Sequence, residues 1–266
     1  SDETFTLALT SDDAATAVDP SAGQASVSIL NDDEGQRLIG TPGPDAITGT
    51  PGDDRIEGLA GADTLYGDDD QLTTGPNGDD LILGGDGGDL IGGRVGSDTV
   101  EGGLGDDVIE IIGFGDDRDV AEGGPGNDVI GPDGFTSNVA ELVARGGAGD
   151  DTLGAGTGGG FASGGDSTLE GGPGNDSLVA EGGEDILRGG AGADTLDAGA
   201  GADLGFGGDG PDRITVSGDD TVEAGADDDT VILLDGAAVV SGGDGDDRLG
   251  FSVSPAPTDP LELRGD

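Results

Sequence analysis

Aspartate recurs at one fixed position of a nine-residue unit along most of the chain. The clearest run is Gly171 to Thr215, where five units stand end to end as GGPGNDSLV, AEGGEDILR, GGAGADTLD, AGAGADLGF and GGDGPDRIT. Position six is always Asp, position four is always Gly, and position eight is apolar in four of the five units. Carboxylates repeated among glycine carbonyls are the oxygen ligands that a hard cation prefers.

The same register continues on both sides of this run. It begins near Gly40 with GTPGPDAIT and ends near Gly250 with GGDGDDRLG. The units around Asp119 and Asp220 depart from the pattern in composition or in length. Eighteen units keep the aspartate at position six, and these residues are the candidate metal ligands: Asp45, Asp54, Asp63, Asp80, Asp89, Asp98, Asp107, Asp119, Asp128, Asp151, Asp176, Asp185, Asp194, Asp203, Asp212, Asp220, Asp229 and Asp247.

The elements that must position these aspartates follow from the length of the unit. Glycine at positions one, two and four lets the backbone adopt positive φ and pass close to a bound group. The remaining residues have room for a three-residue strand of about 10 Å. One turn and one strand make half a coil, so two units complete a circuit and successive circuits stack as parallel strands. The expected fold class is therefore all-β, a parallel β-roll or β-helix with position eight facing a thin interior.

This stacking would bring like charges together. Asp176, Asp194 and Asp212 would line one edge, and Asp185 and Asp203 the other, about 4.8 Å apart. Carboxylates at that spacing repel and raise one another's pKa, so we expect a counter-ion between the rungs. Calcium accepts irregular oxygen coordination, whereas magnesium requires a tighter octahedron. Zinc and copper favour His or Cys, and the sequence contains neither.

The composition limits the possible partners. The chain has 266 residues, 60 of them Gly, and a formal net charge of −49. Such a charge repels nucleic acid and anionic membranes and attracts cations. No apolar run approaches the ~20 residues that span a bilayer. We therefore expect calcium ions as partners, with no nucleic acid and no membrane insertion. Because a thin core cannot offset the entropy of ordering so many glycines, we also expect metal binding to supply folding free energy.

The units resemble the GGxGxDxUx repeat of the RTX, or hemolysin-type calcium-binding, family. This resemblance implies a parallel β-roll in which the position-six carboxylates and turn carbonyls of neighbouring coils share several calcium ions. It also implies a secreted, extracellular or cell-surface protein that folds when it meets calcium. The expected function is calcium binding coupled to folding, in a monomeric module of a longer chain. The alternative is a structural spacer or adhesion module that calcium only rigidifies, with a cell-surface or matrix partner.

The ends of the chain differ from the repeat region, which we expect to span residues 36–250 with insertions at 68–74 and 132–145. Within the second insertion, VAELVA suits either a helical turn or an extra strand. In residues 1–35, the alternating segments 4–9 and 25–29 predict a short antiparallel strand pair. ETFTLAL and ASVSILNDDEG resemble the last two strands of a Calx-β domain, and the alternative is a cap on the repeats. Residues 251–266 are predicted to form a terminal strand and a linker.

Three other interpretations fit the residues less well. The chain contains no His, so neither an HExxH zinc site nor a Ser-His-Asp triad can form, and we predict that the protein is not an enzyme. An acidic surface adapted to high salt would not confine Asp to one turn position. An ice-binding solenoid needs flat Thr arrays, but position nine holds residues as different as Thr48, Glu57 and Tyr66.

Overall fold

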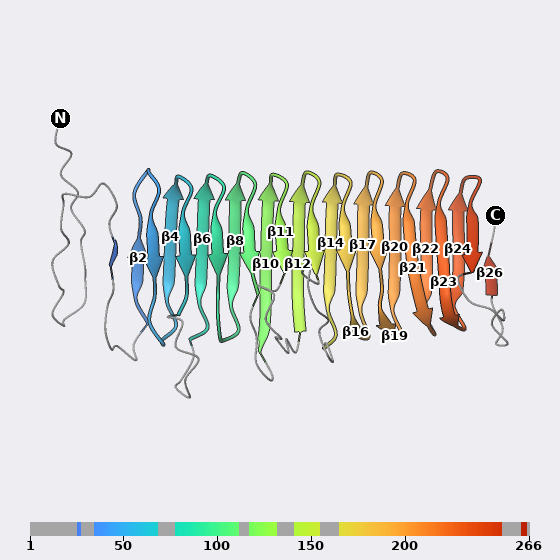
Figure 1. Ribbon diagram of the computed structural model, residues 1–266, viewed down its shortest axis with the longest axis horizontal. Coiled ribbons are helices and arrows are strands. Elements are labelled where there is room, and N and C mark those ends of the chain that lie inside the picture. Colours follow the sequence, from blue (N-terminus) through green and yellow to red (C-terminus); the bar gives the residue numbers. More distant parts are fainter. Residues whose placement is uncertain are drawn as a thin grey trace.

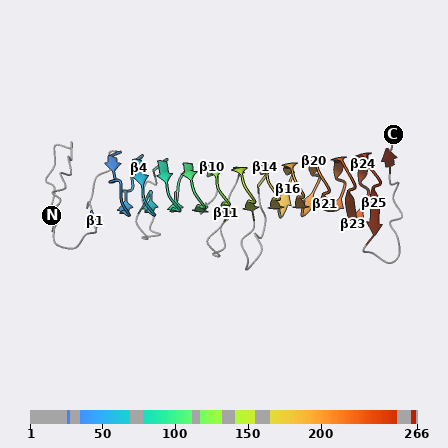
Figure 2. The ribbon, with the colours of Figure 1, turned by 90° about the horizontal axis from the view of Figure 1, so that it is seen from above.

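The computed structural model shows a long stack of β-strands (Figure 1) and describes residues 26–27, 35–68, 78–111, 117–131, 141–154, 165–251 and 262–264. Every regular element in these ranges is a strand. No helix there is long and apolar enough to cross a membrane. Successive strands lie in two layers that run the length of the stack (Figure 2).

The two layers are separate sheets, which we call sheet A and sheet B, and all of their strand pairs are parallel. Sheet A has 14 strands: β1 Ser26–Val27, β3 Ala46–Thr48, β5 Thr64–Tyr66, β7 Leu90–Gly92, β9 Val108–Glu110, β11 Val129–Gly131, β13 Thr152–Gly154, β15 Ser177–Val179, β16 Gly182–Gly183, β18 Thr195–Asp197, β19 Ala200–Gly201, β21 Arg213–Gly218, β23 Thr230–Gly236 and β25 Arg248–Phe251. Sheet B has 12: β2 Arg37–Ile39, β4 Arg55–Ala60, β6 Leu81–Asp86, β8 Thr99–Leu104, β10 Arg118–Pro125, β12 Glu141–Ala148, β14 Thr168–Pro173, β17 Ile186–Ala191, β20 Leu204–Asp209, β22 Thr221–Ala226, β24 Val239–Asp244 and β26 Glu262–Arg264.

Most coils contribute one strand to each sheet, so the chain alternates between the sheets and pairs with itself one coil later. Two coils add a second short strand, β16 or β19, to sheet A. Ile56 in β4, for example, is in register with Ile82 in β6, and Leu65 in β5 with Ile91 in β7. The prediction of an all-β parallel solenoid is confirmed. Sheet B strands are longer than predicted because the turn residues that follow them also pair, as Gly85 does with Gly103.

The core is thin: each strand typically contributes its position-eight side chain, and in several coils a residue two positions later, such as Val216 or Leu233, is buried beside it. Position-eight residues such as Ile82, Ile91 and Leu187 have 0 % exposed surface and face one another between the sheets. Because each coil buries so few apolar atoms, most of the remaining buried groups lie in the turns. Those turns contain the predicted ligands.

The ends and insertions differ in part from expectation. β1 pairs parallel with β3, so it extends sheet A. Segment 4–9, which was predicted to pair with it in an antiparallel manner, and the Calx-β resemblance that rests on this segment lie outside the described residues. Residues 141–145, predicted to fall within an insertion, form the first part of β12, which resolves the ambiguity in VAELVA in favour of a strand. β26 pairs with β24 and continues sheet B.

Candidate metal sites at the two corners

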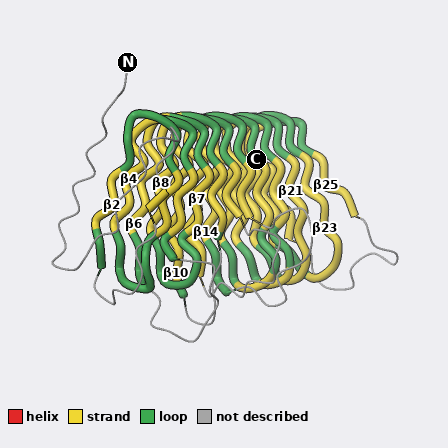
Figure 3. The backbone as a smooth tube through the Cα atoms, turned by 60° about the vertical axis from the view of Figure 1, so that its left-hand side comes forward, coloured by secondary structure: helices red, strands yellow, loops and turns green. Residues whose placement is uncertain are grey.

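The eighteen predicted aspartates form two rows along the stack. Each aspartate lies just before a strand begins, except Asp119, which is the second residue of β10. We call the rows the A row and the B row after the sheet that the chain enters next. Figure 3 shows the turns of successive coils aligned along the edges. The A row contains Asp45, Asp63, Asp89, Asp107, Asp128, Asp151, Asp176, Asp194, Asp212, Asp229 and Asp247. The B row contains Asp54, Asp80, Asp98 and Asp119, and then Asp185, Asp203 and Asp220.

One oxygen of each carboxylate fixes the stacking of the coils. Along the A row the main-chain N–H of each aspartate donates to Oδ1 of the aspartate one coil later, from Asp45 and Asp63 to Asp229 and Asp247. The N–O distances are 2.8 to 3.0 Å. The B row repeats this bond, for example from Asp80 N–H to Asp98 Oδ1 at 2.8 Å. The predicted rows of aspartates along the two edges are therefore present, and a hydrogen bond joins each aspartate to the next one in its row wherever the row is continuous.

The other carboxylate oxygen is buried and has no hydrogen-bond donor in thirteen of these residues. They are only 1 to 3 % exposed. A buried carboxylate oxygen that lacks a donor costs free energy, because water no longer solvates it. These oxygens therefore need a proton or a cation. The residues are Asp63, Asp80, Asp89, Asp107, Asp119, Asp128, Asp151, Asp176, Asp185, Asp194, Asp203, Asp212 and Asp229.

Three aspartates have a different environment. Oδ2 of Asp45, Asp54 and Asp220 accepts a main-chain N–H from its own turn, donated by Thr41, Thr50 and Ser217 respectively. Asp45 and Asp247, at the ends of the A row, are also less buried than the others. The need for a cation is thus strongest in the interior of each row.

Burial changes the acidity of these carboxyl groups. It raises the pKa of Asp80 to about 8 and that of Asp98, Asp119, Asp151 and Asp212 to about 7. The main-chain hydrogen bond from the preceding coil opposes this shift, and neighbouring carboxylates such as Asp176 beside Asp151 add to it. A charged aspartate is thus unfavourable in these turns unless positive charge lies nearby.

In most units glycine at position one lets the buried oxygen pack closely against the backbone, whereas the units of Asp185, Asp203 and Asp229 have Ala there. A Cβ built on Gly171 would lie 2.3 Å from Asp176 Oδ2 and 2.7 Å from the carbonyl oxygen of Gly189 in the next coil. Gly189 has the same surroundings, with Asp194 Oδ2 at 2.4 Å. Because position one has no side chain in these units, a carboxylate oxygen of one coil and a carbonyl oxygen of the next can both lie close to its Cα. Glycines at positions two and four serve the backbone instead, as in Gly172 and Gly174 with φ of +117° and +155°.

Position five provides an internal comparison, and the sequence analysis missed its role. There the direction is reversed: Asp106 Oδ1 accepts from Asn127 N–H one coil later, and Asn127 Oδ1 accepts from Asp150 N–H, both at 2.8 Å. These side chains are exposed. Asp and Asn alternate in this row, and Ala193 and Pro211 also occupy the position. The frequency of Asp and Asn at position five was the available signal.

The comparison isolates what position six requires. Asn127 and Asn175 show that an amide oxygen forms the same inter-coil hydrogen bond. The bond alone therefore does not explain why every coil of the A row carries Asp. The distinguishing feature is the second oxygen, which is buried and carries negative charge. A cation can bind to it, whereas an asparagine would place an NH₂ group in the same position.

Carbonyl oxygens would have to complete any such site. Across the described residues, no group of three or more His, Cys, Asp or Glu side chains is arranged to hold a metal. One carboxylate per turn with glycine carbonyls around it is an all-oxygen donor set, which fits calcium better than zinc or copper.

A comparison with protein families agrees with this donor set. The family model described as RTX calcium-binding nonapeptide repeat (4 copies) matches residues 39–71, 74–109, 115–130, 161–196, 180–214 and 214–249, which together make up more than half of the chain. No curated protein matches the chain significantly.

Proposed function

Since this chain belongs to the RTX calcium-binding nonapeptide repeat family, we propose that it is a calcium-binding module whose aspartate rows hold a series of calcium ions. Position-six carboxylates and turn carbonyls would supply the ligands. The calcium ions would supply positive charge between coils that otherwise repel. All eighteen aspartates named from the sequence remain candidates, and the thirteen with an unpartnered Oδ2 are the strongest.

The observation that carries the proposal is the buried oxygen Oδ2. In residues such as Asp151, Asp176 and Asp194, Oδ1 is used by the neighbouring coil, whereas Oδ2 is buried and has no donor. Protonation would satisfy one such group, but a row of them near neutral pH calls for a cation.

We further propose that calcium binding is coupled to folding. The metal-free stack would place many unscreened charges in its turns, while its core is only one or two side chains wide on each sheet. Metal binding to the folded chain alone therefore contributes directly to the free energy of folding. An extracellular or secreted setting, where calcium is abundant, suits such a protein. The monomeric state and the predicted absence of catalysis, nucleic acid and membrane insertion stay predictions.

A calcium titration of the full chain tests this function. The chain is dialysed against chelator, and circular dichroism and calorimetry are then recorded as calcium is added, with magnesium as the control cation. We expect strand structure and several bound ions with calcium, and much weaker effects with magnesium. A complete strand spectrum in chelator would disprove the coupling to folding. Calcium binding undetectable by calorimetry would disprove the function.

A further inference from the structure

The two aspartate rows are not equivalent, because only the B row is interrupted. β10 and β12 pair with Asp119 opposite Leu142, so Leu142 occupies the corner position of the next coil. The coil after that has Ser167 there, whose N–H donates to Asp185 Oδ1 at 2.7 Å. The A row passes the same coils without a break, through Asp128, Asp151 and Asp176. Two consecutive B corners therefore lack a carboxylate.

The backbone changes at this interruption. Elsewhere in sheet B, pairing between coils starts at position seven, as it does for Leu81 and Thr99. Between β10 and β12 it starts two residues earlier, with Arg118 opposite Glu141. Strand pairing between β10 and β12 thus includes position six, where neighbouring coils elsewhere in the B row are joined by the aspartate hydrogen bond.

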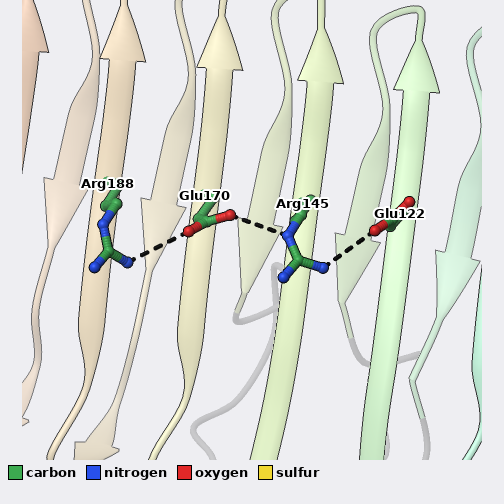
Figure 4. A network of polar contacts seen from close by, with 4 residues as sticks. All are labelled: Glu122, Arg145, Glu170 and Arg188. Atoms are coloured by element: carbon green, nitrogen blue, oxygen red, sulfur yellow. Dashed lines mark hydrogen bonds and ion pairs between the residues drawn. The ribbon is translucent and has the colours of Figure 1, made fainter.

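A chain of ion pairs spans the same coils on the outer face of sheet B (Figure 4). Arg145 Nη1 lies 3.1 Å from Glu122 Oε1, and Arg145 Nε lies 3.0 Å from Glu170 Oε2. Arg188 Nη1 continues the chain, 3.4 Å from Glu170 Oε1. These side chains come from β10, β12, β14 and β17, which are consecutive strands of sheet B. β10 contains Asp119, the last aspartate before the gap, and β17 follows Asp185, the first one after it.

A further pair strengthens the first of these steps. Arg118 Nε lies 3.1 Å from Glu141 Oε2, at the corner where β10 and β12 meet. The step from Asp119 to Leu142 is therefore crossed by two ion pairs and by added strand pairing.

We propose that the B-row cations form two separate groups, divided at Leu142 and Ser167, and that the ion pairs of Glu122, Arg145, Glu170 and Arg188 hold the coils together across this cation-free gap. The division of the cations into two groups depends on the proposed calcium function. The role of the ion pairs in joining the coils does not. One group lies at Asp54 to Asp119 and the other at Asp185 to Asp220. The A row is continuous and has no such gap.

Hydrogen exchange of the full chain at saturating calcium tests the ion pairs. Arg145→Gln removes two pairs at once, and we expect roughly two- to ten-fold faster exchange in β12 and β14, the range for loss of exposed pairs. Salt at about 1 M should have the same effect on wild type, because the paired side chains are exposed and screened. A variant with all four charges inverted, E122R/R145E/E170R/R188E, should restore slow exchange.

The matched control is Arg37→Gln, which breaks an exposed pair between β2 and β4 (Arg37 Nη2 to Glu57 Oε1, 2.9 Å) beside a corner that has Asp54. It should leave exchange of β4 unchanged. Wild-type exchange rates in Arg145→Gln would overturn the role of the ion pairs.

Calcium stoichiometry tests the gap itself. The double variant L142D/S167D supplies the missing carboxylates and should bind at least one more calcium ion per chain than wild type. An unchanged stoichiometry, with wild type still binding calcium, would overturn the division into two groups. If wild type binds no calcium, the proposed function fails, while the exchange comparison still decides what the ion pairs do.

Discussion

At the scale of single residues, the chemistry lies in the second oxygen of the position-six aspartate. Oδ1 does what an asparagine does at position five, since it accepts an N–H from a neighbouring coil. Oδ2 is buried and in most units lies close to the glycine at position one, together with a carbonyl oxygen from the next coil. The two oxygens of one carboxyl group thus have different roles: Oδ1 makes a structural hydrogen bond, and Oδ2 is the candidate metal ligand.

Replacing Asp194 by Asn tests this distinction. The amide can still accept the N–H of Asp176, but it removes the charge, so we expect Asp194→Asn to bind at least one fewer calcium ion per chain. The melting temperature in calcium should also fall, by about 2–4 °C for each kcal/mol of stability lost. Calorimetry and thermal unfolding provide the measurements.

Asp150→Asn is the matched control, because it is the same substitution at exposed position five. Its Oδ1 accepts the N–H of Asn175, which an amide oxygen can also do. It should leave the stoichiometry unchanged. An equal loss in both variants would mean that general acidity, and not the buried row, attracts the ions.

At the scale of elements, a typical strand is held by its position-eight core side chain and by its two neighbours in the sheet, and β21 and β23 each add a second buried side chain. Leu196 in β18 is 1 % exposed and lies in register with Leu178 in β15 and Ile214 in β21. Ala198, which follows β18, is also 1 % exposed but is smaller, so Leu196 contributes most of the apolar burial of this coil in sheet A.

Truncating Leu196 to Ala should therefore cost about 2–5 kcal/mol, the range for a buried leucine that leaves a cavity. Because the contacts of a coil are with its neighbours, we expect faster hydrogen exchange in β15, β18 and β21 and little change in β3 or β25. Val108→Ala is the control, since Val108 is 41 % exposed on the outer side of β9. Uniform loss of protection along the whole stack would contradict a local effect.

The elements also show how far sequence patterns lead. The nine-residue period correctly predicted the parallel stack and the position-eight core, because the same turn and strand recur in nearly every unit. Residues 141–145, the first part of β12, were assigned to an insertion because Leu142 replaces the aspartate that marked the register. The ion pairs of Arg145 were missed because its partners lie 23 and 25 residues away, at separations set by turns of unequal length.

At the scale of the whole molecule, stability without metal should depend on pH in the direction opposite to that of a protein stabilised by ionised carboxylates. Burial raises the pKa of many aspartates in the folded chain above the ordinary value of 3.8, to about 6 for Asp194 and to about 8 for Asp80. The folded state therefore binds more protons than the unfolded state. Its stability is greatest below the unfolded pKa and is lost as pH rises through the folded values, from about 6 to 8.

In chelator, strand content measured by circular dichroism should thus fall between about pH 5 and 8, and calcium should abolish that fall because it replaces the protons. Sedimentation at each pH controls for aggregation. Strand content that rises with pH in chelator would contradict the raised pKa values.

The inter-coil bonds at position six all point the same way: the earlier coil donates its N–H and the later coil accepts with its carboxylate. The stack thus has a head and a tail of different chemistry. Trimming coils from the C-terminal end removes the acceptors of the position-six bonds, whereas trimming from the N-terminal end removes the acceptors of the position-five bonds, in which the later coil donates. A cut at either end would therefore expose bare N–H groups at one turn position and bare side-chain oxygens at the other, so neither end of a shortened stack closes itself.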